Sequence, residues 1–156
     1  MKVARVTVSD RASAGIYADR GGPEVERVFR LHWPETCEIL SSMVSDERDL
    51  IARDLARLAD EEGCALILTT GGTGPAPRDV TPEATRDVLE KELPGFGELQ
   101  RMLSFPTVPT AILSRATAGV RGRTLIVNLP GNPKAIAECL PPLIPAIREA
   151  LRHLAE

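Results

Sequence analysis

The feature that most restricts the fold of this chain is a run of uninterrupted apolar residues, Ala65 to Leu68, which lies between Gly63 and a glycine-rich loop. A strand with one face in solvent alternates apolar and polar residues. A continuous apolar run is instead typical of a central parallel strand that is covered on both faces. The run therefore favours a sheet with helices on each side.

Strand and helix patterns alternate along the rest of the chain. Further strands are expected at 3–8, 38–44 and 124–128, while 110–117 fits either a short strand or a loop. Helices are expected at 23–31, 46–62, 82–93, 96–103, 133–140 and 142–155. This alternation predicts an α/β fold, a three-layer α/β/α sandwich with a mostly parallel central sheet, in a single domain over residues 1–156.

Helix boundaries follow from capping residues and prolines. Ser45, Thr81 and Asn132 are the expected N-caps, because their short side chains can accept a hydrogen bond from the first turn of a helix. The apolar stripe Leu50, Ile51, Leu55 and Leu58 is expected to face the core. Prolines 141, 142 and 145 predict a break in the C-terminal helical region, since proline cannot continue a helix without losing a hydrogen bond.

Charge and composition exclude several classes of function. The net charge is −3 and the 156 residues include only five aromatic ones, which argues against a nucleic-acid-binding protein. No apolar run is long enough to cross a membrane, and the charged start lacks the apolar core of a signal peptide, so we expect a cytoplasmic protein. The three cysteines lack the spacing of a zinc site or a disulfide framework and are expected to be reduced and buried. Small-molecule chemistry is the favoured class.

The loop after the apolar run is the first candidate site. Glycines 71, 72 and 74 would let backbone amides approach an anion closely, although a tight turn at the end of a strand explains them as well. Asp79 precedes the next helix and could hold Mg²⁺ or only offset the helix dipole. Its neighbour Arg78 could hold phosphate.

Three other loops follow predicted strands, and ligands bind at the carboxyl ends of such strands. Asp46 could be a second metal-binding carboxylate or a dipole partner at a helix start. The segment Ser9 to Ser13 contains hydroxyls, an acid and an arginine, and it could bind a ligand or be a surface loop. The turn Leu129 to Pro133 is equally consistent with a ligand contact and a helix cap. The two histidines, His32 and His153, are given no catalytic role.

Together these segments resemble the molybdopterin adenylyltransferase family, the Mog/MoaB-type domain that also occurs in gephyrin. The matching segments span nearly the whole chain, from Val3 to Leu154. They are Thr69–Gly74 with Arg78–Thr85, and then Ser9–Ser13, Ser45–Glu47, Pro94–Gly97, Leu113–Arg115, Gly122–Leu125 and Leu129–Gly131.

The resemblance implies a function in molybdenum cofactor biosynthesis: Mg²⁺-dependent transfer of AMP from ATP to the terminal phosphate of molybdopterin, with release of pyrophosphate. It implies that Asp46 and Asp79 are catalytic and hold the metal. It also implies a homotrimer and a hand-over of product to a molybdate-inserting protein. The residues it places at the substrates are Ser9, Asp10, Arg11, Ser13, Gly71, Gly72, Thr73, Gly74, Arg78, Ser114, Pro130 and Gly131.

Such a reaction requires no activated side chain, because the phosphate monoester is itself the nucleophile. Three alternatives remain open at this stage. The chain could be a non-catalytic pterin-binding or assembly protein of the same fold, or it could serve the tungsten version of the pathway. It could also be an unrelated α/β domain that binds a sugar phosphate or a nucleotide.

Overall fold

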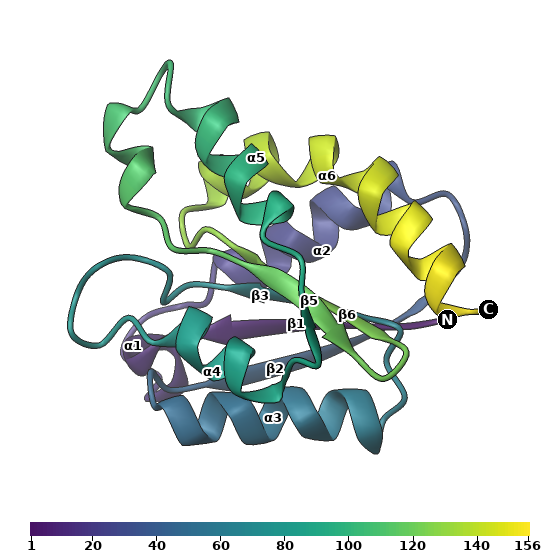
Figure 1. Ribbon diagram of the computed structural model, residues 1–156. Helices are drawn as coiled ribbons and strands as arrows, with labels where there is room; N and C mark the ends of the chain where they lie inside the picture. Colours follow the sequence, from purple (N-terminus) through teal and green to yellow (C-terminus); the bar gives the residue numbers. More distant parts are fainter.

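A computed structural model describes residues 1–156, and its centre is a six-stranded sheet in the order β2-β1-β3-β6-β5-β4 (Figure 1). Strands β1 (Lys2–Val8), β2 (Glu38–Val44), β3 (Leu66–Thr70) and β6 (Thr124–Leu129) run parallel to one another. Strands β5 (Ala118–Arg121) and β4 (Lys91–Glu92) extend the sheet beyond β6. Strand β5 pairs antiparallel with β6, and β4 pairs antiparallel with β5. The prediction of an α/β fold with a mostly parallel sheet is confirmed.

Helices cover both faces of the sheet (Figure 1). One layer contains α2 (Gly21–His32), α5 (Gly95–Ser104) and α6 (Pro133–Leu154). The other contains α3 (Arg48–Asp60), α4 (Thr81–Val88) and the short α1 (Asp10–Ser13). A 3-10 helix, η1 (Pro109–Leu113), follows α5.

The core divides into two clusters because successive strand residues point to opposite faces. Leu66 and Leu68 of β3 pack in the cluster that contains α2 and α6. Ile67, between them, packs in the cluster that contains α3. Every residue of β3 is buried, as expected for a central strand covered on both sides.

Several predicted boundaries were wrong. The helix expected from Asp46 begins at Arg48 and Ser45 does not cap it, while Leu50 of its predicted stripe is exposed. Thr81 is the first residue of α4, so it is not the N-cap. Asn132 does cap α6, since its side chain accepts a hydrogen bond from the Lys134 amide.

The segment 110–117 forms no strand. Its first part belongs to the 3-10 helix η1, which has Pro109 in its first turn. The strand of this region is β5, which begins at Ala118 and forms a hairpin with β6 through Gly122, at a φ of 56°. Neither β5 nor the two-residue β4 was expected, because both are too short to show the alternation of apolar and polar residues that marks a strand.

The predicted break in the C-terminal helix was also wrong, because α6 is a single helix of 22 residues that includes Pro141, Pro142 and Pro145. It bends along its length (Figure 1), as helices commonly do at proline. Burial of Leu140, Leu143 and other apolar side chains against the sheet offsets the lost backbone hydrogen bonds. No helix combines the length and the apolar composition needed to cross a membrane.

Candidate active site

The four parallel strands end at the same edge of the sheet. Val8 pairs with Val44, Thr7 with Thr70, and Thr70 with Leu129, so the loops after β1, β2, β3 and β6 begin side by side. A cavity of about 360 Å³ lies among these loops. It is lined by Thr7, Val8, Ser9, Tyr17, Asp19, Arg20, Gly21, Asp46, Thr70, Gly71, Gly72, Asp79, Gly131 and Pro133.

Gly71 and Gly72 form the floor of the loop after β3, at φ angles of 98° and 68° that favour glycine over any other residue. A side chain at Gly71 would collide with the carbonyl of Val8, and one at Gly72 with the hydroxyl of Thr81. Thr81 holds both glycines: its hydroxyl donates to the Gly71 carbonyl at 2.9 Å and its amide to the Gly72 carbonyl at 3.1 Å. The loop therefore presents backbone without side chains to the cavity, and the first residue of α4 holds it in place.

Asp46 is joined to the start of α1 by a reciprocal pair of hydrogen bonds. Its carboxylate accepts from the amide of Asp10 at 2.9 Å, and its own amide donates to the Asp10 carboxylate at 3.0 Å. Burial raises the pKa of Asp46, and the negative charges of Asp10 and Asp79 add to this effect. Asp46 is thus a partly buried carboxylate with an excess of negative charge around it.

Asp79 reaches the same cavity from the loop before α4. Its carboxylate accepts from the amide of Ala76 at 3.0 Å, and its amide donates to the Ala76 carbonyl at 2.9 Å. The structure therefore brings together the two aspartates that the sequence predicts to be catalytic, although they are 33 positions apart in sequence (79 − 46).

Arg78 does not line this cavity and pairs with carboxylates. Its guanidinium donates to both oxygens of Asp10, at 2.9 and 3.0 Å, and to Glu47 at 3.0 Å. The hydrogen bond from Arg78 lowers the pKa of Asp10. Arg78 thus joins the loop that contains Asp79 to the starts of α1 and α3.

Of the other residues predicted to contact the substrates, some line this cavity and the rest lie outside it. Ser9, Gly71, Gly72 and Gly131 line the cavity, and Asp10 contacts it through Asp46. The remaining ones, which do not line it, are Arg11 and Ser13 of α1, Thr73, Gly74, Ser114 and Pro130.

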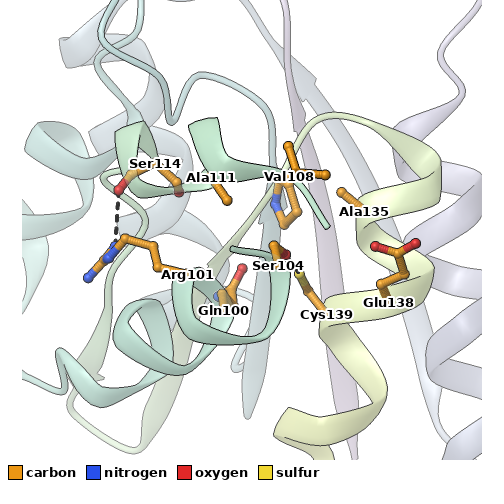
Figure 2. A pocket seen from close by; sticks show the side chains of 10 residues that line it. Gln100, Arg101, Ser104, Val108, Ala111, Ser114, Ala135, Glu138 and Cys139 are labelled. Carbon is orange, nitrogen blue, oxygen red and sulfur yellow. Dashed lines mark hydrogen bonds between the residues drawn. The ribbon is translucent and has the colours of Figure 1, made fainter. Parts of the chain in front are cut away.

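Ser114 and Pro130 line a second cavity, of about 170 Å³, between α5, η1 and α6 (Figure 2). Arg101 donates to the Ser114 carbonyl at 3.1 Å across one side of it. Because Pro130 and Gly131 are adjacent, the turn between β6 and α6 separates the two cavities. The hydroxyl of Thr70 holds this turn by donating to the Pro130 carbonyl at 2.7 Å.

Sequence reasoning missed Asp19, which lines the first cavity with its side chain only 11% exposed. Its carboxylate accepts hydrogen bonds from the Thr7 hydroxyl at 2.8 Å and the Gly22 amide at 3.0 Å, and it pairs with Arg5. The signal in the sequence was an aspartate shortly before a helix start, which is typical of an N-terminal cap. Tyr17, also missed, shares a hydrogen bond with Ser9.

A site of this composition suits a phosphate-bearing ligand with a hard cation. Three aspartates and glycine backbone line a common space, and Asp19 among them is already paired with Arg5. Neither histidine and no cysteine lines it. Oxygen donors of this kind prefer Mg²⁺ to softer metals. Acid–base catalysis by histidine or attack by a thiolate has no candidate residue in this cavity.

Comparison with known proteins agrees with this picture. Residues 4–149 match a family described as "Probable molybdopterin binding domain". A Helicobacter pylori protein named molybdopterin adenylyltransferase is 54% identical over 142 residues, which cover 91% of this chain and 81% of that protein.

Two solved structures are similar over nearly their full lengths. The molybdopterin biosynthesis enzyme MoaB from Thermus thermophilus is 44% identical with a TM-score of 0.88, covering 98% of this chain and 95% of that one. The tungsten cofactor synthesizing protein MoaB from Pyrococcus furiosus is 31% identical with a TM-score of 0.86, covering 99% and 97%.

Proposed function

We propose that this chain, which belongs to the family of probable molybdopterin binding domains, is a molybdopterin adenylyltransferase of molybdenum cofactor biosynthesis. It transfers AMP from ATP to the terminal phosphate of molybdopterin and releases pyrophosphate. The observation that carries the proposal is the meeting of Asp46, Asp79 and the Gly71–Gly72 backbone in one cavity at the carboxyl edge of the sheet.

The residues present fit a Mg²⁺ ion that is shared with the nucleotide. Mg²⁺ is usually bound through one or two carboxylates and substrate phosphates rather than by a complete protein cage. Of the three aspartates that line the cavity, Asp19 is paired with Arg5, which leaves Asp46 and Asp79 for a cation. The chain gathers no group of three or more candidate metal ligands. Asp46 and Asp79 would hold the ion, and the raised pKa of Asp46 indicates a site where a cation would be favourable.

The chain's own residues act mainly by positioning. An oxygen of the molybdopterin phosphate attacks the α-phosphorus of ATP, and the bond from that phosphorus to the bridging oxygen of the β-phosphate breaks. No base is needed, because the attacking phosphate is already ionised at neutral pH. Gly71, Gly72 and Gly131 allow the phosphate chain to approach the backbone closely. Bound Mg²⁺ would neutralise the charge that develops on the phosphate oxygens.

The two cavities suggest how the substrates are divided. We place the triphosphate of ATP in the cavity with the aspartates. We place the acceptor substrate beside the second cavity, which is lined by Ser114 and Pro130. Arg78 lies next to the first cavity, bound to Asp10, and could exchange this partner for a phosphate oxygen.

The experiment is to incubate the purified protein with ATP, Mg²⁺ and molybdopterin, and to measure adenylylated pterin and pyrophosphate. We expect both products from wild type. Asp79→Asn should lower kcat at least about 100-fold, since one metal-binding charge is lost while size is kept. Asp60→Asn, an exposed aspartate that pairs with Arg121, is the matched control and should keep the wild-type rate.

Binding of molybdopterin without product formation would instead indicate a non-catalytic pterin-binding or assembly protein. Use of the product for tungsten rather than molybdenum is the second candidate, favoured by the similarity to the Pyrococcus furiosus protein. Loading of the purified product with each metal would separate these two pathways.

The assembly and setting of the enzyme are also part of the proposal. The homotrimer is what the resemblance implies, and association between copies of the chain is supported by six large apolar side chains exposed in one segment, Met102, Leu103, Phe105, Val108, Ile112 and Leu113. The continuous sheet supports a single domain. The product would pass to a molybdate-inserting protein, and the reduced cysteines 37, 64 and 139 suit a cytoplasmic location.

A further inference from the structure

The loop that contains Asp79 has few internal restraints along its middle. Residues 74–80 form neither helix nor strand, and Pro75 to Arg78 are exposed. The hydrogen bonds between Ala76 and Asp79 close a small turn within the loop. They do not attach that turn to the sheet or to a helix, so the position of the Asp79 carboxylate depends on contacts from elsewhere in the chain. The side chain of Arg78 makes one set of these, to Asp10 and Glu47, but no contact of that side chain holds the backbone of Asp79 itself.

Arg115, which follows η1, supplies such contacts from more than 30 positions away. Its Nε donates to the carbonyl of Gly74 at 3.0 Å, and its Nη2 donates to the carbonyl of Asp79 at 2.7 Å. Its backbone amide donates to the carbonyl of Thr73 at 2.8 Å. One residue therefore joins the two ends of the exposed segment to each other and to the segment before β5.

The guanidinium is itself anchored to α4. Its Nη1 is hydrogen-bonded to the carboxylate of Glu83, in the first turn of that helix. Burial raises the pKa of Glu83, but Arg115 outweighs this effect and leaves that pKa below its usual value, so Glu83 stays ionised at neutral pH. The first turn of α4 is buried around Ala84, which packs in the core, so the position of Glu83 is fixed by that packing.

We infer that Arg115 is a positioning residue for adenylyl transfer: it holds the backbone of Asp79, and through it the Asp79 carboxylate, in place in the cavity. The inference rests on the proposed function and adds a residue that lies outside the cavity. The planar fork of arginine reaches two carbonyls and a carboxylate at once. Lysine presents its three donors from one nitrogen on a flexible stem and lacks the planar fork that places three separate nitrogens at these acceptors.

The test compares Arg115→Ala, Arg115→Lys and wild type in steady-state kinetics at 25 °C, with melting curves for each. We expect Arg115→Ala to lower kcat about 100-fold, since a small displacement of a catalytic group has such an effect. The KM for molybdopterin should stay within about twofold, and the Mg²⁺ concentration for half-maximal rate should rise. Arg115→Lys keeps the charge beside Glu83, and its kcat should still fall at least about 10-fold.

A readout without turnover is hydrogen exchange of the amides in residues 73–80, which should become faster in both variants than in wild type. The matched control is Arg86→Ala, which removes another exposed guanidinium 3.9 Å from Glu83 that contacts no carbonyl of the loop. Its kcat and its loop exchange should equal those of wild type.

The inference is overturned if a folded Arg115→Ala or Arg115→Lys variant keeps the wild-type kcat and Mg²⁺ dependence, or if Arg86→Ala shows the same loss. If Arg115→Ala is unfolded at 25 °C, Arg115→Lys decides. A wild-type protein that forms no adenylylated pterin overturns the proposed function itself, whereas unchanged loop exchange in the variants overturns only the inference.

Discussion

At the scale of single residues, the surroundings of Asp46 oppose its negative charge. Burial and the nearby carboxylates of Asp10 and Asp79 raise the pKa of Asp46 above the ordinary value of 3.8. An acid whose pKa is higher in the folded state destabilises the fold once it is ionised. Such a group is retained more readily for binding a cation than for stability.

Asp46→Asn should therefore slow pyrophosphate release at least about 100-fold without lowering the melting temperature at pH 7. The asparagine oxygen can still accept the hydrogen bond from the Asp10 amide, and the desolvated charge is removed. Because α3 begins at Arg48, Asp46 does not cap that helix. Thermal melting and pyrophosphate release are the two assays, and a variant that melts earlier but keeps the wild-type rate would contradict the metal-binding role.

The pH dependence of kcat/KM gives a second prediction about Asp46. The ionised form binds the cation, so activity is lost as pH falls through the pKa of Asp46. Since burial raises that pKa, the acidic limb should lie at a higher pH than for an ordinary aspartate. This limb should vanish in the residual activity of Asp46→Asn. A wild-type profile that stays flat down to the ordinary aspartate range would contradict the assignment.

At the scale of elements, α6 tolerates three prolines because its packing outweighs its backbone hydrogen bonding. Pro141, Pro142 and Pro145 lack the amides that would bond to the carbonyls four residues earlier. Their neighbours Leu143, Ile144 and Ile147 are buried in the core shared with β3 and β6. Burial of large aliphatic side chains contributes roughly 1.5–3 kcal/mol each, which is comparable to the cost of a proline within a helix.

Pro145→Ala should stabilise the protein by about 1–2 kcal/mol, or a few degrees in Tm. The Pro145 side chain is exposed, so little packing is lost, and the new amide can donate to the Pro141 carbonyl. Differential scanning calorimetry of the variant and of wild type is the measurement. A lower Tm would indicate that the bend of α6 is itself required for its packing.

At the scale of the whole molecule, the six large apolar side chains exposed between Met102 and Leu113 lie on α5, η1 and the segment that joins them. Exposed apolar patches on folded proteins are typical of interaction sites. In the proposed homotrimer this patch would be covered by another copy of the chain.

The double variant Met102→Lys/Ile112→Lys should therefore shift the solution mass from that of three chains toward the 16.8 kDa of one. Both side chains are exposed, so the charges should not disturb the core of a single chain. Leu31→Lys is the matched control, since Leu31 is as exposed as Met102, at 71%, but lies on α2. Light scattering after gel filtration is the measurement, and a wild-type mass of one chain would contradict the trimer.

The sequence by itself determined the fold class and the order of the main elements. The apolar run at 65–68, the strand at 38–44 and the Asn132 cap are local signals, because each depends on the period or the side chain of a few adjacent residues. The sequence also identified Asp46 and Asp79 as candidates, since each follows a predicted strand and precedes a helix. The residues alone left each of them as either a metal ligand or a helix-dipole partner, and the resemblance to a family favoured the catalytic role.

Only the tertiary structure decided which of these residues share a cavity. Ser114 and Gly131 were predicted to contact the same substrates, yet they line different cavities, while Asp19 was missed. The continuity of α6 and the restraint of Asp79 by Arg115 were equally hidden. In each case the deciding energy comes from contacts between residues far apart in sequence, and local propensity contains no information about such contacts.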